Sequence, residues 1–127
     1  MGTALAERLL EHGCSLFVWN RTREKSEPLL ARGAQWAENP FATCQRVILS
    51  LYTTEVVMEV LDLMENRFRP GQIIMDTTTG DPAKSTALGK RLAERGIQYL
   101  DAPISGSSEQ TRRGDRCAID LACSWNA

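Results

Sequence analysis

Two short, largely apolar runs, at residues 47–51 and 73–76, constrain the fold of this 127-residue chain more than any other feature. Each is bounded by polar or turn-forming residues, which is typical of strands buried on both faces of a parallel sheet. Residues 54–66 lie between them and carry apolar side chains at helical spacing, and residues 82–95 do the same before a last predicted strand at 98–101. This alternation predicts an α/β fold, in which helices cover both faces of a parallel sheet.

The N-terminal third of the chain follows the same alternation. The predicted elements are a helix at 3–12 ended by Gly13, a strand at 14–19, a helix at 23–32, and a short strand at 34–37 before a turn at 39–40. In an open parallel sheet, ligands bind beyond the carboxyl ends of the strands. Polar residues follow three of the predicted strands, at 20–22, 77–79 and 105–107. We therefore expect a ligand site at this edge of the sheet.

The turn after the predicted strand at 14–19 carries Asn20, Arg21 and Thr22, eighteen residues after Gly2. In dinucleotide-binding folds an acidic residue at this place binds the ribose 2′-hydroxyl, whereas an arginine accommodates a 2′-phosphate. This turn has no acid, and the Arg21 guanidinium is a planar, always charged donor suited to phosphate. The turn therefore favours NADP over NAD. The alternative interpretation is a solvated loop in which Thr22 caps the next helix.

The opening of a dinucleotide-binding fold is a strand followed by G-x-G-x-x-G, whose glycines bring backbone amides to the pyrophosphate. Of this pattern the chain has only the last glycine, Gly2. In the strand order 3-2-1-4-5-6 the first strand is central. We therefore expect a partial Rossmann-type parallel sheet with its first strand missing, so that the strands at 14–19 and 47–51 face a gap. We further expect a domain at residues 1–107 and a divergent, poorly ordered tail at 108–127.

The amino-acid composition argues against some classes of binding partner. The formal net charge is −1 and the 15 Lys and Arg residues are scattered, which argues against nucleic-acid and membrane-surface partners. No run approaches the ~20 apolar residues of a membrane span, so we expect a soluble, cytoplasmic protein with small-molecule partners. His12, the single histidine, lies at the end of a predicted helix. The cysteines show no metal-binding or redox spacing and are expected to be reduced; they are Cys14, Cys44, Cys117 and Cys123.

Four segments carry a family resemblance. They are Met1-Gly2 with Ala4, Leu5, Ala6, Leu9 and Leu10; Trp19-Asn20-Arg21-Thr22 with Lys25; Asp76-Thr77-Thr78-Thr79 with Pro82; and Asp101-Ala102-Pro103-Ile104-Ser105-Gly106 with Gly114. In this order and spacing they resemble the motifs of the 3-hydroxyisobutyrate dehydrogenase family of β-hydroxyacid dehydrogenases, which includes NADP-dependent glyoxylate and succinic semialdehyde reductases. The last segment resembles the D-A-P-V-S-G-G substrate motif and is the most specific. A parent enzyme of the 6-phosphogluconate dehydrogenase type fits it less well.

The resemblance implies hydride transfer between NADP(H) and a small hydroxyacid, semialdehyde or glyoxylate. The cofactor contacts that it implies are Gly2, Asn20, Arg21, Thr22, Leu51, Tyr52 and Thr79, with the turn at 20–22 at the ribose phosphate and Thr79 near the nicotinamide. It implies that Ser105, Gly106 and Ser107 hold the substrate carboxylate through hydroxyls and backbone N–H groups. The family has a glycine where this chain has Ser107.

Oxidation of an alcohol also needs a group that accepts the hydroxyl proton. The family's lysine, in a G-x-x-x-K-x-x-x-N helix, lies beyond the end of this chain, as does the C-terminal helical domain that closes the cleft and builds dimers. Lys25, Lys84 and Lys90 lack that motif and are interpreted as solvated charges. We therefore expect the NADP-binding portion of a hydroxyacid dehydrogenase, inactive alone and without a catalytic residue of its own. The alternative is a non-catalytic truncated product, or a nucleotide-binding or assembly module.

Overall fold

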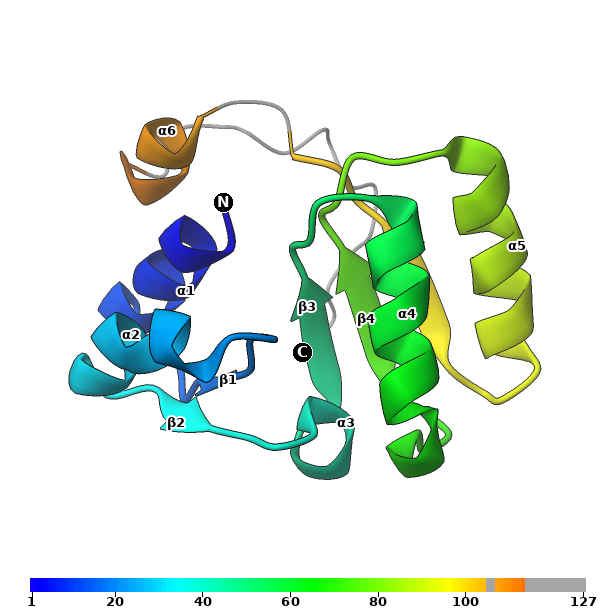
Figure 1. Ribbon diagram of the computed structural model, residues 1–127, viewed down its shortest axis with the longest axis horizontal. Helices are drawn as coiled ribbons and strands as arrows, with labels where there is room; N and C mark the ends of the chain where they lie inside the picture. The colour runs from blue at the N-terminus through cyan, green and yellow to red at the C-terminus, as the bar shows by residue number, and fades with distance from the viewer. Residues whose placement is uncertain (105–106, 114–127) are drawn as a thin grey trace.

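The computed structural model describes residues 1–104 and 107–113. Helices and strands alternate through this range, and the strands pair in parallel (Figure 1). In chain order the elements are α1 (Gly2–Glu11), β1 (Phe17–Val18), η1 (Arg23–Ser26), α2 (Glu27–Ala31), β2 (Gln35–Trp36), α3 (Pro40–Thr43), β3 (Arg46–Leu49), α4 (Thr54–Met64), η2 (Glu65–Arg67), β4 (Ile73–Asp76), α5 (Pro82–Ala93), β5 (Gln98–Asp101) and α6 (Ser108–Arg113), where η denotes a 3₁₀ helix. The α/β fold expected from the sequence is confirmed.

The sheet of the described chain has two parts. Strands β1 and β2 pair with each other, and β3, β4 and β5 form a second sheet in that order. In the second sheet Leu49, Asp76 and Asp101 lie in register, so the three strands end at one edge. Within the described residues no pairing joins β1 to β3, so the two sheets are separate.

The main core lies between the second sheet and its helices. Val47 and Leu49 of β3 and Ile74 of β4 are buried together with side chains of α4 and α5. Figure 1 shows α4 in front of β3 and β4, with α5 beside it. On the opposite face of β3, Ile48 is 43% exposed. The prediction that this strand is buried on both faces is therefore wrong for Ile48, because α4 and α5 pack on the other face of the sheet.

A smaller core joins α1 and α2 to the first sheet. Ala6, Leu29 and Ala34 are buried there, and Val18 of β1 packs against them. Trp19, the residue after β1, packs against the main core instead. The Trp19 side chain thus provides an apolar contact between the two parts of the fold.

Several predicted elements are shorter than their sequence patterns suggest. The strand expected at 14–19 pairs only at Phe17 and Val18, because β1 has β2 as its one neighbour in the described chain. The helix expected at 23–32 begins as the 3₁₀ turn η1, and α2 starts only at Glu27, where Pro28 occupies the first turn and lacks an N–H to donate to that turn. The expected turn at 39–40 starts the short helix α3, capped by the Asn39 side chain, which accepts a hydrogen bond from the Phe41 N–H at 3.0 Å.

The segment from residue 108 was expected to be poorly ordered, but Ser108–Arg113 form α6, which packs on α1. The Arg112 Nε donates to Glu7 at 2.6 Å, and the Thr111 hydroxyl donates to the Met1 sulfur at 3.2 Å. Residues 114–127, the rest of the predicted tail, lie outside the described residues. Through residues 1–104 and 107–113 the structure contains no helix long and apolar enough to cross a membrane.

Candidate functional site

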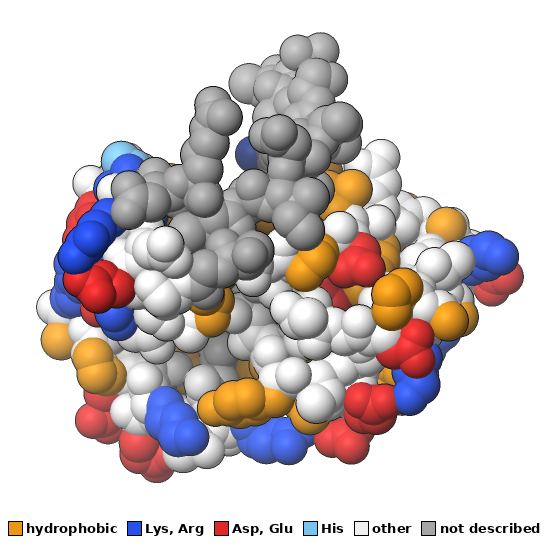
Figure 2. Space-filling model, turned by 90° about the horizontal axis from the view of Figure 1, so that it is seen from above, with side chains coloured by type: hydrophobic (Ala, Val, Ile, Leu, Met, Phe, Trp, Pro, Cys, Tyr) orange, Lys and Arg blue, Asp and Glu red, His pale blue; other side chains and the backbone are white. Residues whose placement is uncertain are grey.

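The carboxyl ends of β3 and β4 border a hollow of about 230 Å³. It is lined by Met1, Ser50, Leu51, Tyr52, Ile104 and the threonines at 77–79. Three of the residues predicted to contact a cofactor, Leu51, Tyr52 and Thr79, therefore come together here. Figure 2 looks down on this edge: Lys and Arg side chains are interspersed with Asp and Glu around the outline, without a large field of one sign among the side chains coloured by type.

Two threonines hold the loops of the hollow in place. The Thr77 hydroxyl donates to the Leu49 carbonyl at 2.7 Å, and the Thr78 hydroxyl accepts from the Leu51 N–H at 3.0 Å. Both side chains are buried, whereas Thr79 is exposed at the rim. These threonines do not cap the next helix, since the N-cap of α5 is Asp81, whose side chain accepts from the Ala83 N–H at 2.9 Å.

The buried carboxylate of Asp76 also holds the loop at 77–79 in place. Asp76 is 2% exposed and accepts hydrogen bonds from the Tyr99 hydroxyl at 2.6 Å and from the Thr78 N–H at 2.9 Å. Burial, together with the hydrogen bond to Asp76, raises the pKa of Tyr99 far above its ordinary range. Tyr99 therefore remains a protonated donor, and Asp76 serves as an acceptor that fixes the loop.

The first turn of α1 borders the hollow. Met1 lines it, and a Cβ placed on Gly2 would lie 3.4 Å from the Ser50 Cβ, so the start of α1 lies directly against the loop after β3. The N-terminal end of a helix carries unpaired N–H groups and the positive end of the helix dipole. This end of α1 is therefore favourable for an anionic group such as a phosphate.

The turn after β1 is held by its own side chains and by α4. The Asn20 side-chain oxygen accepts from the Thr22 N–H at 2.9 Å, and the Arg21 Nη2 donates to the Glu59 Oε2 at 3.1 Å. Thr22 precedes η1, but its hydroxyl makes no capping hydrogen bond. The neighbouring Arg23 guanidinium lies 4.9 Å over the Trp36 ring. Arg21 therefore presents an exposed cation at the turn, with a carboxylate partner that the sequence did not reveal.

The predicted substrate residues are only partly described. Ser105 and Gly106 lie outside the described residues. Ser107 caps α6: its hydroxyl accepts from the Gln110 N–H at 3.1 Å, and its own N–H donates to the Gln110 side chain at 2.8 Å. Its polar groups are therefore engaged within the chain, as an ordinary turn would have them.

The three lysines of the chain lie away from the hollow at the carboxyl edge. Lys25, Lys84 and Lys90 are exposed, and Lys84 pairs with Glu55, which raises the pKa of the ammonium group. Lys84 is therefore protonated at neutral pH, which agrees with its interpretation as a solvated charge.

The histidine and the described cysteines show no sign of a reactive site. His12 is the C-terminal cap of α1. Cys14 and Cys44 are free thiols, and burial raises the pKa of Cys44. In the part of the chain that the structure describes, no cluster of His, Cys, Asp or Glu could hold a metal ion.

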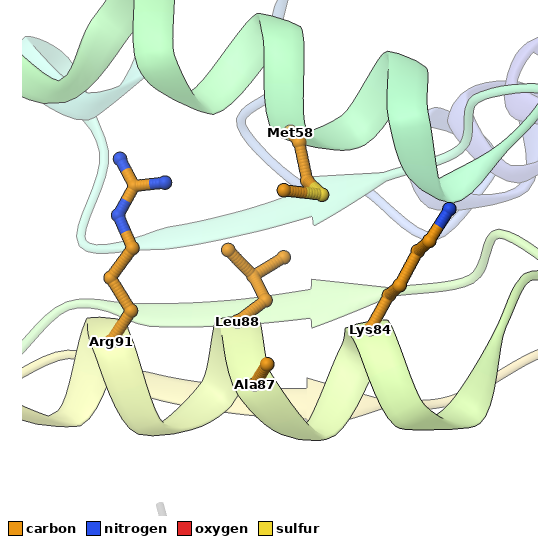
Figure 3. A pocket seen from close by; sticks show the side chains of 5 residues that line it. All are labelled: Met58, Lys84, Ala87, Leu88 and Arg91. Atoms are coloured by element: carbon orange, nitrogen blue, oxygen red, sulfur yellow. The ribbon is translucent and has the colours of Figure 1, made fainter.

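A second hollow, of about 160 Å³, lies between α4 and α5 (Figure 3). Met58, Ala87 and Leu88 line it, with Lys84 and Arg91 at its two ends. Both cations are already paired with carboxylates of α4 or η2. Because it has little besides apolar surface to offer a ligand, this hollow is a poorer candidate than the one at the carboxyl edge.

Comparisons with known proteins agree with this geometry. Residues 1–119 match the family described as the NAD binding domain of 6-phosphogluconate dehydrogenase. The chloroplastic glyoxylate/succinic semialdehyde reductase 2 of Arabidopsis thaliana is 32% identical over 120 residues, which cover 90% of this chain and 34% of the plant protein. An imine reductase from Myxococcus stipitatus, solved in complex with NADP+, is 29% identical with a TM-score of 0.80, over 87% of this chain and 39% of that one.

The structure of 3-hydroxyisobutyrate dehydrogenase from Mycobacterium tuberculosis with L-serine has a TM-score of 0.82. It is 22% identical, over 89% of this chain and 40% of that one, and at this identity it shows the fold alone. The fold and the edge site thus define a Rossmann-type domain that binds a nicotinamide dinucleotide. The chain belongs to the family of NAD-binding domains of 6-phosphogluconate dehydrogenase, and the plant glyoxylate/succinic semialdehyde reductase is one of its relatives. It spans about a third of the length of the curated relative.

Proposed function

We propose that this chain binds NADP(H) and forms the nucleotide-binding portion of an oxidoreductase that transfers hydride between NADP(H) and a small β-hydroxyacid, semialdehyde or glyoxylate. The name of the plant relative, a glyoxylate/succinic semialdehyde reductase, supports this substrate class. The NADP+ in the complex of the imine reductase supports the phosphorylated cofactor. The sequence motif at 101–106 favours the hydroxyacid branch of the family.

The observation that carries the proposal is the turn Asn20–Thr22. It follows β1 at the carboxyl edge, it contains no acid, and its Arg21 guanidinium is 62% exposed. An acid at this place would repel a 2′-phosphate, whereas a guanidinium donates two parallel hydrogen bonds to it. The turn therefore fits NADP better than NAD.

The remaining contacts follow from the hollow at the carboxyl edge. Gly2 at the start of α1 would approach the pyrophosphate, where the helix terminus favours negative charge. Leu51 and Tyr52 would line the cofactor, Thr79 would lie near the nicotinamide, and Asn20 and Thr22 would complete the ribose contacts. When bound, the nicotinamide supplies the hydride chemistry. For the substrate carboxylate we retain Ser105, Gly106 and Ser107 as the proposed binding segment.

No proton acceptor for the substrate hydroxyl is assigned within this chain. The lysines at positions 25, 84 and 90 are exposed, and none lines the hollow. Proton transfer by a positioned group contributes about 10²- to 10⁴-fold to catalysis. We therefore expect the isolated chain to bind NADPH but not to consume it with glyoxylate or succinic semialdehyde.

The substitution Arg21→Ala tests the cofactor assignment. We expect NADPH binding to weaken by roughly 1.5 to 3 kcal/mol, the range for a hydrogen bond to a charged group, with little change in NADH binding. Isothermal titration calorimetry on both cofactors measures the two losses, and Arg91→Ala serves as the control, because Arg91 is also an arginine paired with carboxylates but lies on α5 and is only partly exposed. Equal losses for NADPH and NADH in Arg21→Ala would refute the assignment.

A further inference from the structure

The Glu59 carboxylate forms an ion pair with Arg21, the cation of the candidate cofactor turn. The Arg21 Nη2 lies 3.1 Å from the Glu59 Oε2, although the two residues are 38 positions apart. Both side chains are exposed, at 62% and 66%. The pair therefore joins the turn after β1 to the solvent face of α4, at a place where both groups are accessible to a ligand.

The other carboxylates of α4 are directed elsewhere. Glu55, one turn earlier, pairs with Lys84, and Asp62, nearly one turn later, accepts from Arg91 at 2.6 Å. Both of these cations belong to α5. Glu59 thus differs from its neighbours in contacting the turn after β1.

The neighbouring arginine at the turn is also engaged. The Arg23 Nη1 lies 3.7 Å from the Glu38 Oε1, and its guanidinium stacks over Trp36. Arg21 and Arg23 therefore have separate acidic partners, and the Glu59 contact belongs to Arg21.

A 2′-phosphate and a carboxylate need the same donors. Both are oxyanions that accept hydrogen bonds from the guanidinium fork, and each is repelled by the other when both approach one cation. Binding of a 2′-phosphorylated nucleotide at Arg21 must therefore displace Glu59 or weaken its contact. A nucleotide with a free 2′-hydroxyl carries no phosphate at this position, so its binding leaves the contact between Glu59 and Arg21 in place.

We propose that Glu59 is a specificity-determining residue, which competes with the ribose 2′-phosphate for Arg21 and so limits the preference of this site for phosphorylated over unphosphorylated nucleotides. This inference rests on the proposed function, because it assumes that Arg21 receives the 2′-phosphate. It predicts that neutralising Glu59 strengthens selectivity, which is the opposite of what loss of a supporting contact would do.

The test uses two adenosine nucleotides that differ at the 2′ position, 2′,5′-ADP and 5′-AMP, titrated into the full chain by calorimetry. Exposed ion pairs contribute about 0.2 to 1 kcal/mol, so Glu59→Gln is expected to tighten 2′,5′-ADP binding by about 1.4- to fivefold. It should leave 5′-AMP binding unchanged. Glu55→Gln is the matched control on the same helix and should change neither affinity. Thermal melting of each variant shows whether the fold is retained.

A double variant separates competition from direct repulsion. In the Arg21→Ala background, Glu59→Gln is expected to leave 2′,5′-ADP binding unchanged, because the shared cation is gone. An unchanged or weaker affinity of Glu59→Gln in the native background overturns the proposal. So does the same tightening in the Arg21→Ala background, which would show that Glu59 repels the phosphate directly. If Arg21→Ala alone leaves 2′,5′-ADP binding intact, or if the native chain binds neither nucleotide, the proposed function fails together with this inference.

Discussion

The substitution Gly80→Ala is expected to destabilise the loop that carries Thr79. A Cβ on Gly80 would lie 1.9 Å from the Thr54 Oγ1 and 3.2 Å from the Thr54 Cβ. Thr54 begins α4, is 4% exposed, and its hydroxyl accepts from the Asp81 N–H at 3.0 Å. The added methyl group must therefore displace this hydroxyl and break the hydrogen bond.

The expected cost follows from two contributions. An unpaired backbone N–H costs about 1 to 3 kcal/mol, and forcing an extra methyl group into a packed site typically costs a further 1 to 3 kcal/mol. Because rotation of the Thr54 side chain relieves part of the overlap, we expect a loss of about 2 to 4 kcal/mol for Gly80→Ala. Removing the obstructing oxygen with Thr54→Ala should relieve the overlap with the new methyl group.

Urea denaturation of the native chain, both single variants and the double variant measures this coupling. We expect the double variant to be no less stable than Thr54→Ala alone, so that the coupling energy equals the whole cost of Gly80→Ala, about 2 to 4 kcal/mol. Gly89→Ala is the control, because its Cβ would make only an ordinary 3.4 Å contact with Tyr99 and it lies within α5. Native-like stability of Gly80→Ala, or additive losses in the double variant, would contradict the steric argument.

Two further predictions concern contacts that hold the fold around the site. Gln72 is 2% exposed, and its side chain makes three hydrogen bonds to backbone groups. Gln72→Leu should therefore lower the free energy of unfolding, measured by urea denaturation, by about 3 to 5 kcal/mol. A loss below about 1 kcal/mol would show that these backbone groups find other partners. The hydrogen bond from Arg112, with Arg32 nearby, lowers the pKa of Glu7 below its ordinary value of 4.5. The contact between α6 and α1 is therefore fully stabilising above pH 4.5, and this stabilisation is lost as the pH falls through the lowered pKa of Glu7. Hydrogen exchange of α6 should therefore quicken in Glu7→Gln at pH 7 and converge with the native rate at strongly acid pH, whereas equal rates at pH 7 would rule out this role.

The sequence predicts best the elements that local pattern determines. The strands expected at 73–76 and 98–101 coincide with β4 and β5, because short segments bounded by helices and turn residues leave few alternatives. The position of Leu51 and Tyr52 beside Thr79 also follows from the pattern, since parallel strands end at one edge.

Tertiary contacts account for what the sequence does not predict. The pairing of Arg21 with Glu59 spans 38 positions and has no local signature. The hydroxyls of Thr77 and Thr78 bond to the end of β3 rather than to α5, which depends on how the loops meet. The exposure of Ile48 likewise depends on which face the helices cover, and a continuous apolar run does not specify that face.

The central claim is that a nicotinamide dinucleotide binds along the carboxyl edge with its 2′-phosphate at Arg21. Backbone amide chemical shifts of the labelled chain, recorded during titration with NADP+ and with NAD+, test it most directly. We predict that both cofactors shift the amides of Gly2, Leu51, Tyr52 and Thr79, and that only NADP+ shifts Arg21 and Thr22 strongly. Shifts confined to the hollow between α4 and α5, or identical responses of residues 20–22 to the two cofactors, would contradict the account.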